Sequence, residues 1–304
     1  MIRAGALTLL LAGPAAADDL CPAAWERVAT TLSAFGAAHG TVRQEGDWCL
    51  VQGMVLDLEG QYLPDWHMDR LRFRGSAVKW VVDGSSAPEG LEIAVEGLRL
   101  VVQTGNAQFD WLYAAQARAN MIDAKASLTW DAKTRVLRLE GLSIDFPGDN
   151  QVDLSAALTG VDLSSTGAVQ MSTTSFALTE ADLKVTTHGL FEGYLLMPLG
   201  SAFLPHEGDM AAAVDSIRTE LISAVVALPP SSFSDASKDA LLALIMQLPN
   251  PSGEVTMSLR AAPGIGPARL AGYALVGVPQ SVADFEPLFQ GVTVDVGWNH
   301  TDAP

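Results

Sequence analysis

Val95-Glu96-Gly97-Leu98-Arg99-Leu100 is the first of three related stretches that decide the fold. Leu139-Glu140-Gly141-Leu142-Ser143-Ile144 repeats its pattern closely, and Leu158-Thr159-Gly160-Val161-Asp162-Leu163 repeats it with more changes. In each stretch the apolar positions change parity at the glycine. One extra residue there, a β-bulge, would return the second apolar set to the face of the first. The stretches therefore predict curved, bulged strands with one continuous apolar side. The alternative is that each glycine ends one strand and begins another.

Alternation of apolar and polar residues extends this prediction along most of the chain. From about residue 41 the period is two, which is typical of half-buried strands. Clusters of turn-forming residues separate strands of about ten residues. The clearest strands are 136–139, 152–156, 255–259 and 292–298, with a further strand around 270–278, and the clearest turns are 83–86, 131–134 and 147–150. A weaker fourth copy of the repeat lies at 58–60.

Helical patterns are expected in two places. Pro22 begins an N-terminal helix whose apolar residues recur at helical spacing, and Gly40 ends the pattern. The second place is an insertion at about 189–249, with a short helix at 190–197 and a hairpin of two longer helices at 210–228 and from Ser232 or Ser234 to Leu248. The predicted fold class is α+β, mainly β: a long curved antiparallel sheet with bulged strands, an N-terminal helix and a helical hairpin insertion.

The first 17 residues resemble an export signal. Arg3 supplies a positive start, an apolar run of about ten residues follows, and Ala15-Ala16-Ala17 offers a cleavage site before Asp18. The run is too short for a permanent anchor, and the residues before Cys21 do not form a lipoprotein signal. We therefore expect cleavage between Ala17 and Asp18 and a soluble periplasmic product. Residues 18–304 are expected to form a single β-rich domain.

Charge and cysteine content limit the function classes. The chain has a net charge of −17, so its field repels nucleic acid and anionic membrane surfaces. Its 49% hydrophobic content nevertheless favours folding. Cys21 and Cys49 are the two cysteines, and in an oxidising compartment they are expected to form a disulfide. A redox or metal role is disfavoured because C-x-x-C spacing is absent.

No local motif indicates catalysis, a cofactor or a metal site. The sequence lacks the zinc-protease, nucleophile-elbow and phosphate-loop patterns, so we assign no catalytic, cofactor-binding or metal-ligating residue. A secreted hydrolase with a triad assembled from distant residues remains an alternative, and it would use His67, His188 or His206. Asp145, Asp149, Asn150 and Asp153 could hold calcium but are ordinary turn residues. Trp66, Trp80, Trp111, Trp130 and Trp298 could form a sugar platform but fit strand cores better.

The strand pattern resembles that of uncharacterised envelope proteins of Gram-negative bacteria, which in turn resemble AsmA-like proteins. The resemblance rests on the Glu-Gly-Leu bulges, Thr187-His188-Gly189-Leu190-Phe191 before the helices, and the closing Gly291-Val292-Thr293-Val294 strand. It covers about residues 90–300 and implies a long curved antiparallel sheet with a role in lipid handling or envelope maintenance. The chain lacks the N-terminal membrane anchor of AsmA-like proteins, and the resemblance carries over no catalytic residue.

We therefore expect a non-enzymatic periplasmic protein that binds a lipid or another apolar envelope component in a curved β-groove. The apolar helix of the insertion would either leave this groove open or fill it. The residues expected to line the groove are Leu98, Leu100, Leu142, Ile144, Leu241, Leu244 and Ile245. A structural or interaction protein of the cell envelope is the second alternative beside the hydrolase. The sequence leaves the oligomeric state open.

Overall fold

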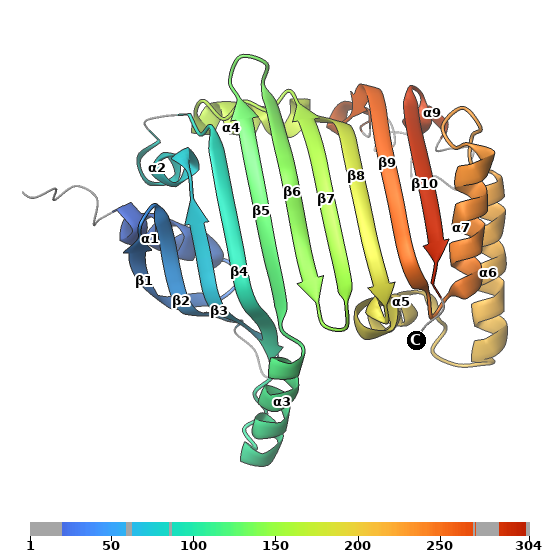
Figure 1. Cartoon of the computed structure of the whole chain (residues 1–304), viewed down its shortest axis with the longest axis horizontal. Coiled ribbons are helices and arrows are strands. Elements are labelled where there is room, and N and C mark those ends of the chain that lie inside the picture. The colour runs from blue at the N-terminus through green and yellow to red at the C-terminus, as the bar shows by residue number, and fades with distance from the viewer. Residues whose placement is uncertain (1–19, 59–62, 85–86, 270, 272–285, 302–304) are drawn as a thin grey trace, which may run out of the picture.

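A single antiparallel sheet of ten strands organises the molecule (Figure 1). The computed structural model describes residues 20–58, 63–84, 87–269, 271 and 286–301. Each strand pairs with the next one along the chain, so the spatial order is the sequence order. The strands are β1 (Ala37–Glu45), β2 (Trp48–Asp57), β3 (Asp65–Arg74), β4 (Gly90–Val101), β5 (Ile122–Asp131), β6 (Val136–Phe146), β7 (Asn150–Thr159), β8 (Ala177–His188), β9 (Ser252–Ile265) and β10 (Val292–His300).

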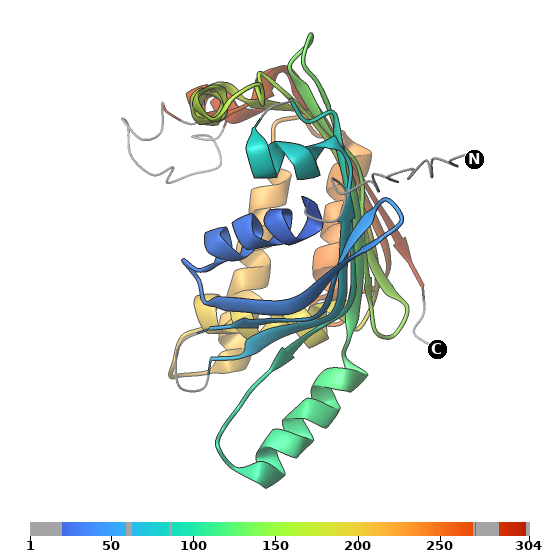
Figure 2. The ribbon, with the colours of Figure 1, turned by 90° about the vertical axis from the view of Figure 1, so that its left-hand side faces the viewer.

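Helices occupy the connections between strands. Figure 2 shows α1, α2 and the helices between β8 and β9 on one side of the sheet, while the other side carries none of them. The helices are α1 (Leu20–Leu32), α2 (Ser76–Asp83), α3 (Ala107–Ala119), α4 (Thr166–Ser175), the π-helix η1 (Phe191–Leu195), α5 (Leu196–Phe203), α6 (Met210–Val226), α7 (Asp235–Gln247) and α9 (Glu286–Phe289).

The predicted bulges are present in two of the three repeated stretches. In β4, Val95 pairs with Ala124 and Leu98 with Ile122, so both apolar sets face one side across the extra residue. Gly97 has a φ of 69°, and its N–H donates to the Asp123 carboxylate at 2.8 Å. The register of β6 also shifts between Leu139 and Leu142. The sequence prediction of bulged strands is confirmed at these two glycines.

The third glycine follows only half of the alternative, because it ends one strand but does not begin another. β7 ends at Thr159, and Gly160 leaves it with a φ of 73°. The chain then turns toward α4, where the Val161 N–H donates to the Arg135 carbonyl at 3.1 Å. A bulge at Gly160 is therefore wrong, because the next residues bond to a loop and not to a neighbouring strand. The weak copy at 58–60 lies mostly outside the described residues, as does the strand expected around 270–278.

The N-terminal core is built where α1 and α2 cover β1 to β4. Its buried residues include Trp25, Val51 and Phe73, and the Cys21–Cys49 disulfide joins α1 to β2 within it. The predicted disulfide is confirmed. α1 ends at Leu32, eight residues before Gly40, and Phe35 beyond its end is 71% exposed.

A second core closes the opposite end of the sheet. Phe233, Ala261, Val292 and Val294 are buried there, and α7 packs against β10. The segment before α7 and the first turn of α7 also bond to the outer edge of β10. The Val294 N–H donates to the Ser232 carbonyl at 2.8 Å, and the Val296 N–H donates to the Ser237 hydroxyl at 3.1 Å.

The helical insertion is confirmed, with altered boundaries. α6 and α7 form the expected hairpin, and Ser234 caps α7 by accepting from the Ser237 N–H. The sequence predicts the first helix at 190–197, but helix continues past that end. Pro198 lies at the third position of α5, where a first-turn proline is tolerated.

Helix holds almost as much of the described chain as strand does, so the mainly-β part of the prediction is only partly right. The difference comes from α2, α3 and α4, three connections that the strand period did not reveal. Each depends on local chemistry at its ends. Asn106 caps α3 through two backbone N–H groups, Ser165 caps α4, and Gly84 ends α2 in the left-handed region.

Substitution of the two bulge glycines by alanine should show which of them is required by its backbone conformation and which merely lies in a bulge. Gly97→Ala places a methyl group at positive φ and against the Asp69 carboxylate, so we expect a loss of about 1–2 kcal/mol in unfolding free energy. Gly141→Ala is the matched control, because no atom lies within 4 Å of its new Cβ. Urea denaturation measures both. Equal losses in the two variants would contradict the assignment of strain to Gly97.

Reduction of the disulfide should weaken the N-terminal core. The bond joins residues 28 positions apart, and a loop of that size contributes roughly 3 kcal/mol on the loop-entropy scale. We expect Cys21→Ser/Cys49→Ser to lower the unfolding free energy by about that amount. Reductant should have little further effect on the double variant. A wild-type protein whose stability is unchanged by reductant would contradict this expectation.

Candidate functional site

Apolar side chains form continuous rows across the middle of the sheet. The strand register pairs Ala126 with Leu142, Leu142 with Leu154, and Leu154 with Leu183, which makes one row over four strands. Two further rows run parallel to it. We call the part-buried members the central apolar face: Ala124, Ala126, Leu128, Leu139, Leu142, Ile144, Val152, Leu154, Ala156, Leu183 and Val185.

The described helices flank this face and do not lie across it. α1 and α2 contact β1 to β4, and α7 and α9 contact β10. Among the described elements, no helix backbone approaches β5, β6, β7 or β8 as closely, although the η1 residue Tyr194 packs edge-on against Phe146 at the end of β6, with ring centroids 4.9 Å apart. The side chains of the central apolar face thus remain partly accessible. They lie on the side of the sheet that α1 covers, because Ile93 packs against the N-terminal core and pairs with Ala126 of this face.

The structure brings together only part of the residue set expected to line a groove. Leu142 and Ile144 belong to the central apolar face. Leu98 and Leu100 lie at the end of β4, where Leu100 is 48% exposed. The α7 residues lie at the far end of the sheet: Leu241 packs in the second core, Leu244 is part-buried, and Ile245 is buried. α7 therefore covers β10 and does not fill the middle of the sheet.

Sequence reasoning missed the β7 and β8 members of the face. Val152 and Leu154 stand at alternating positions of β7, and Leu183 and Val185 do so on β8. The period of two was visible at both places. What the sequence lacked was the register, which places these four residues beside Leu142 and Ile144.

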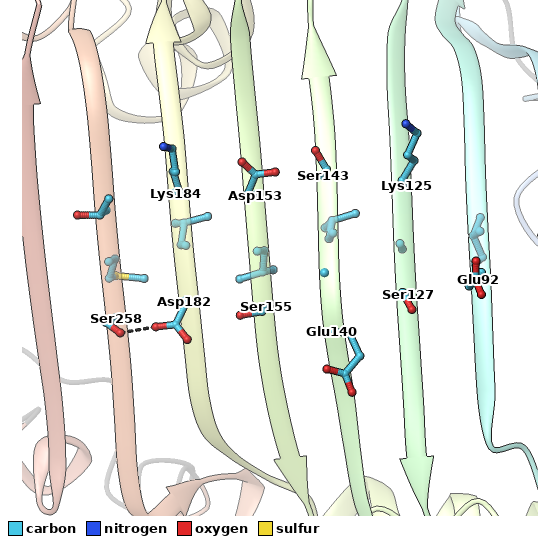
Figure 3. Close-up of a pocket in the computed structure, with 18 of the residues that line it drawn as sticks. Glu92, Lys125, Ser127, Glu140, Ser143, Asp153, Ser155, Asp182, Lys184 and Ser258 are labelled. Atoms are coloured by element: carbon cyan, nitrogen blue, oxygen red, sulfur yellow. Dashed lines mark hydrogen bonds between the residues drawn. The ribbon is translucent and has the colours of Figure 1, made fainter.

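The opposite side of the sheet is a polar surface with a shallow depression of about 930 Å³. One row across it consists of Lys125, Ser143, Asp153 and Lys184, each paired with the next (Figure 3). Asp182 and Ser258 form a hydrogen bond in a neighbouring row. Because alternate residues of a strand point to opposite faces, the polar residues between the apolar ones form this surface.

Ion pairs tie neighbouring strands together on the polar surface. Lys184 Nζ lies 2.6 Å from Glu254 Oε2, and the hydrogen bond to Glu254 raises the pKa of the lysine. Arg260 donates to Asp182 with both terminal nitrogens at 3.0 Å. These bonds, with that from Ser258, lower the pKa of Asp182. Such exposed pairs add little to stability, and each contributes only modestly to the pairing of its two strands.

The three histidines of the hydrolase alternative lie apart and in different settings. His188 Nδ1 is 3.1 Å from the Ser252 hydroxyl, but no carboxylate of the described residues contacts that ring. His67 is on β3 with its Nε2 buried and unpaired. His206 is exposed in the loop between α5 and α6. The part of the chain that the structure describes thus holds no assembled His–carboxylate–hydroxyl triad at these positions.

The acidic turn and the tryptophans also have structural settings. The Asn150 amide donates to the Pro147 carbonyl at 2.6 Å and fastens the turn between β6 and β7. Within the described residues, no group of three or more His, Cys, Asp or Glu side chains is arranged for a metal ion. The tryptophans occupy separate elements: Trp130 is buried and donates to the Val161 carbonyl, whereas Trp111 on α3 is 66% exposed.

Comparison with known proteins adds no identity. No protein-family model matches the chain, and no curated protein shows significant similarity to it. None of the helices in the described residues is long and apolar enough to cross a membrane.

The partly buried setting of His67 should appear in the pH dependence of stability. Burial, and next the nearby Arg99 charge, lower the pKa of His67 against the opposing effects of Asp65 and Asp69. The unfolded chain then binds this proton at higher pH than the folded chain does. The unfolding free energy should therefore be unaffected above the ordinary histidine pKa and should fall as pH drops toward the folded-state pKa.

NMR titration of His67 in the folded protein and in urea measures this difference directly. His67→Gln should remove the corresponding part of the slope of unfolding free energy against pH. A folded-state pKa at or above the value in urea would contradict the prediction.

Proposed function

We propose that this protein is an exported, non-enzymatic periplasmic protein that binds the acyl chains of an envelope lipid against the central apolar face. The observation that carries the proposal is the apolar row from Ala126 to Leu183, which is part-buried and flanked by helices at both ends of the sheet. Apolar surface of this kind binds non-directionally and in proportion to area, which suits a flexible hydrocarbon chain.

Three features support the remaining parts of the proposal. The Cys21–Cys49 disulfide fits an oxidising compartment, and the 17-residue start fits export, although that segment lies outside the described residues. The open, curved antiparallel sheet agrees with the resemblance to AsmA-like envelope proteins. Since no family model matches the chain, the resemblance belongs to the proposal and is not a separate finding.

A structural or interaction protein of the envelope is the second candidate. Its support is the wide polar surface, where charged and hydroxyl side chains alternate over the strands (Figure 3). The two candidates use opposite faces of one sheet, and substitutions can therefore distinguish them.

Paired tryptophan substitutions on β7 test the lipid proposal. Leu154→Trp adds bulk at the centre of the apolar face, whereas Ser155→Trp adds the same group one residue later on the polar surface. The protein is incubated with phosphatidylcholine vesicles that contain a phospholipid with a fluorescent acyl chain. Gel filtration then measures the label that moves with the protein. We expect Leu154→Trp to lower this amount several-fold and Ser155→Trp to leave it unchanged.

Native mass spectrometry followed by organic extraction supplies an independent measurement. We expect lipid to accompany the wild-type protein and to be depleted in Leu154→Trp. If the wild type carries no lipid and acquires no label, lipid binding is rejected. If Ser155→Trp alone disrupts a complex with an envelope protein, the polar surface becomes the functional one.

A further inference from the structure

A separate apolar pocket lies within the helical insertion, away from the central apolar face. It has a volume of about 360 Å³ and is enclosed by η1, α5, α6 and the end of α7. Leu196, Leu199 and Phe203 line it from α5, and Val214 and Leu221 line it from α6. The proposed function does not account for this pocket, because none of its lining residues belongs to the sheet.

The pocket exists because α5 is held away from its neighbours. α6 packs against α7, whereas α5 continues directly from η1 and has no comparably close approach to α6 or α7. Leu199, Val214 and Leu221 consequently remain between 37% and 41% exposed. Protein interiors normally close such gaps to the packing density of organic crystals.

Water is a poor occupant of this space. An ordered water is held by two to four polar partners, and all but one of the side chains that line this open pocket are hydrocarbon or aromatic. An apolar molecule would gain dispersion contacts with the lining and remove the exposed leucines from water. The lining chemistry therefore selects hydrocarbon.

Arg218 is the one charged side chain among the described residues that line the pocket. Its guanidinium donates to the Leu248 carbonyl at 3.1 Å and to the Asp215 carboxylate at 3.0 Å. Asp215 is 74% exposed, so this ion pair is weak and a second carboxylate can take its place. The planar fork of arginine matches a carboxylate with two parallel hydrogen bonds.

We propose that this pocket binds a single-chain fatty acid, with the hydrocarbon chain between α5 and α6 and the carboxylate at Arg218. The negative net charge of the protein opposes the approach of an anionic ligand. A protein of net charge −17 attracts cations at long range, so a preference for a fatty acid over a cationic amphiphile must arise at the site itself.

The first test compares two ligands of equal chain length, dodecanoate and dodecyltrimethylammonium, below their micellar concentrations. Isothermal titration calorimetry on the whole protein should give one dodecanoate site. We expect the cationic compound to bind at least about tenfold more weakly. Equal binding of the two compounds, or no dodecanoate binding, would overturn the proposal.

Two variants with matched controls test whether dodecanoate binds in the pocket and whether its carboxylate contacts Arg218. Val214→Trp fills the pocket and should abolish dodecanoate binding, whereas Val226→Trp lies on the same helix, is 62% exposed in the wild type and should bind normally. Arg218→Gln should weaken dodecanoate binding about tenfold and remove the preference over the cation. Arg118→Gln on α3 is its control. If Val214→Trp loses the circular dichroism spectrum of the wild type, Leu199→Trp fills the pocket from α5.

The proposal for the helical pocket and the proposal for the sheet can be rejected independently of each other. Leu154→Trp should leave dodecanoate binding unchanged, and Val214→Trp should leave phospholipid uptake unchanged. If dodecanoate binding is lost in Leu154→Trp and retained in Val214→Trp, the inference about the helical pocket is wrong and the proposal for the sheet survives.

Discussion

The register between neighbouring strands is the constraint on which the rest of the structure depends. In an antiparallel sheet, a slip of one residue sends every side chain of a strand to the wrong face. Ten strands are aligned here so that Ile93, Ala126, Leu142, Leu154 and Leu183 follow one another across the sheet. The bulges at Gly97 and Gly141 preserve this alignment where the strands change parity. The two faces, one apolar and one charged, follow directly from it.

Packing is uneven along this sheet, and that unevenness creates the candidate sites. The two ends carry hydrophobic cores, closed by α1 and α2 at β1 to β4 and by α7 at β10. The middle strands carry apolar side chains without comparable contact from a described helix. The insertion has a similar region of incomplete packing on a smaller scale, since an apolar space remains between α5 and α6. Both places present hydrocarbon surface that a ligand could bury.

The sequence predicted those parts of the fold in which the pattern is local. The alternating strands, the turn at 147–150, the hairpin of α6 and α7 and the Cys21–Cys49 bond all follow from residue spacing. It did not reveal α2 at 76–83, because its sequence Ser-Ala-Val-Lys-Trp-Val-Val-Asp contains β-branched residues typical of strands. Tertiary packing against α1 and the glycines at both ends select the helix. The sites were harder still, because Leu154 and Arg218 acquire their neighbours only through register and helix packing.

The bonds at the outer edge of β10 also determine how copies of this protein can meet. An exposed strand edge is a template on which another chain can add a strand. Here the N–H groups of Val294 and Val296 are already bonded to Ser232 and Ser237, so that edge is closed to an incoming strand. The opposite edge, β1, has an irregular register around Gly40 and carries Arg43 and Glu45. A sheet with one sealed edge and one irregular, charged edge cannot extend itself indefinitely from copy to copy. A wide apolar face can thus be maintained without polymerisation into fibres.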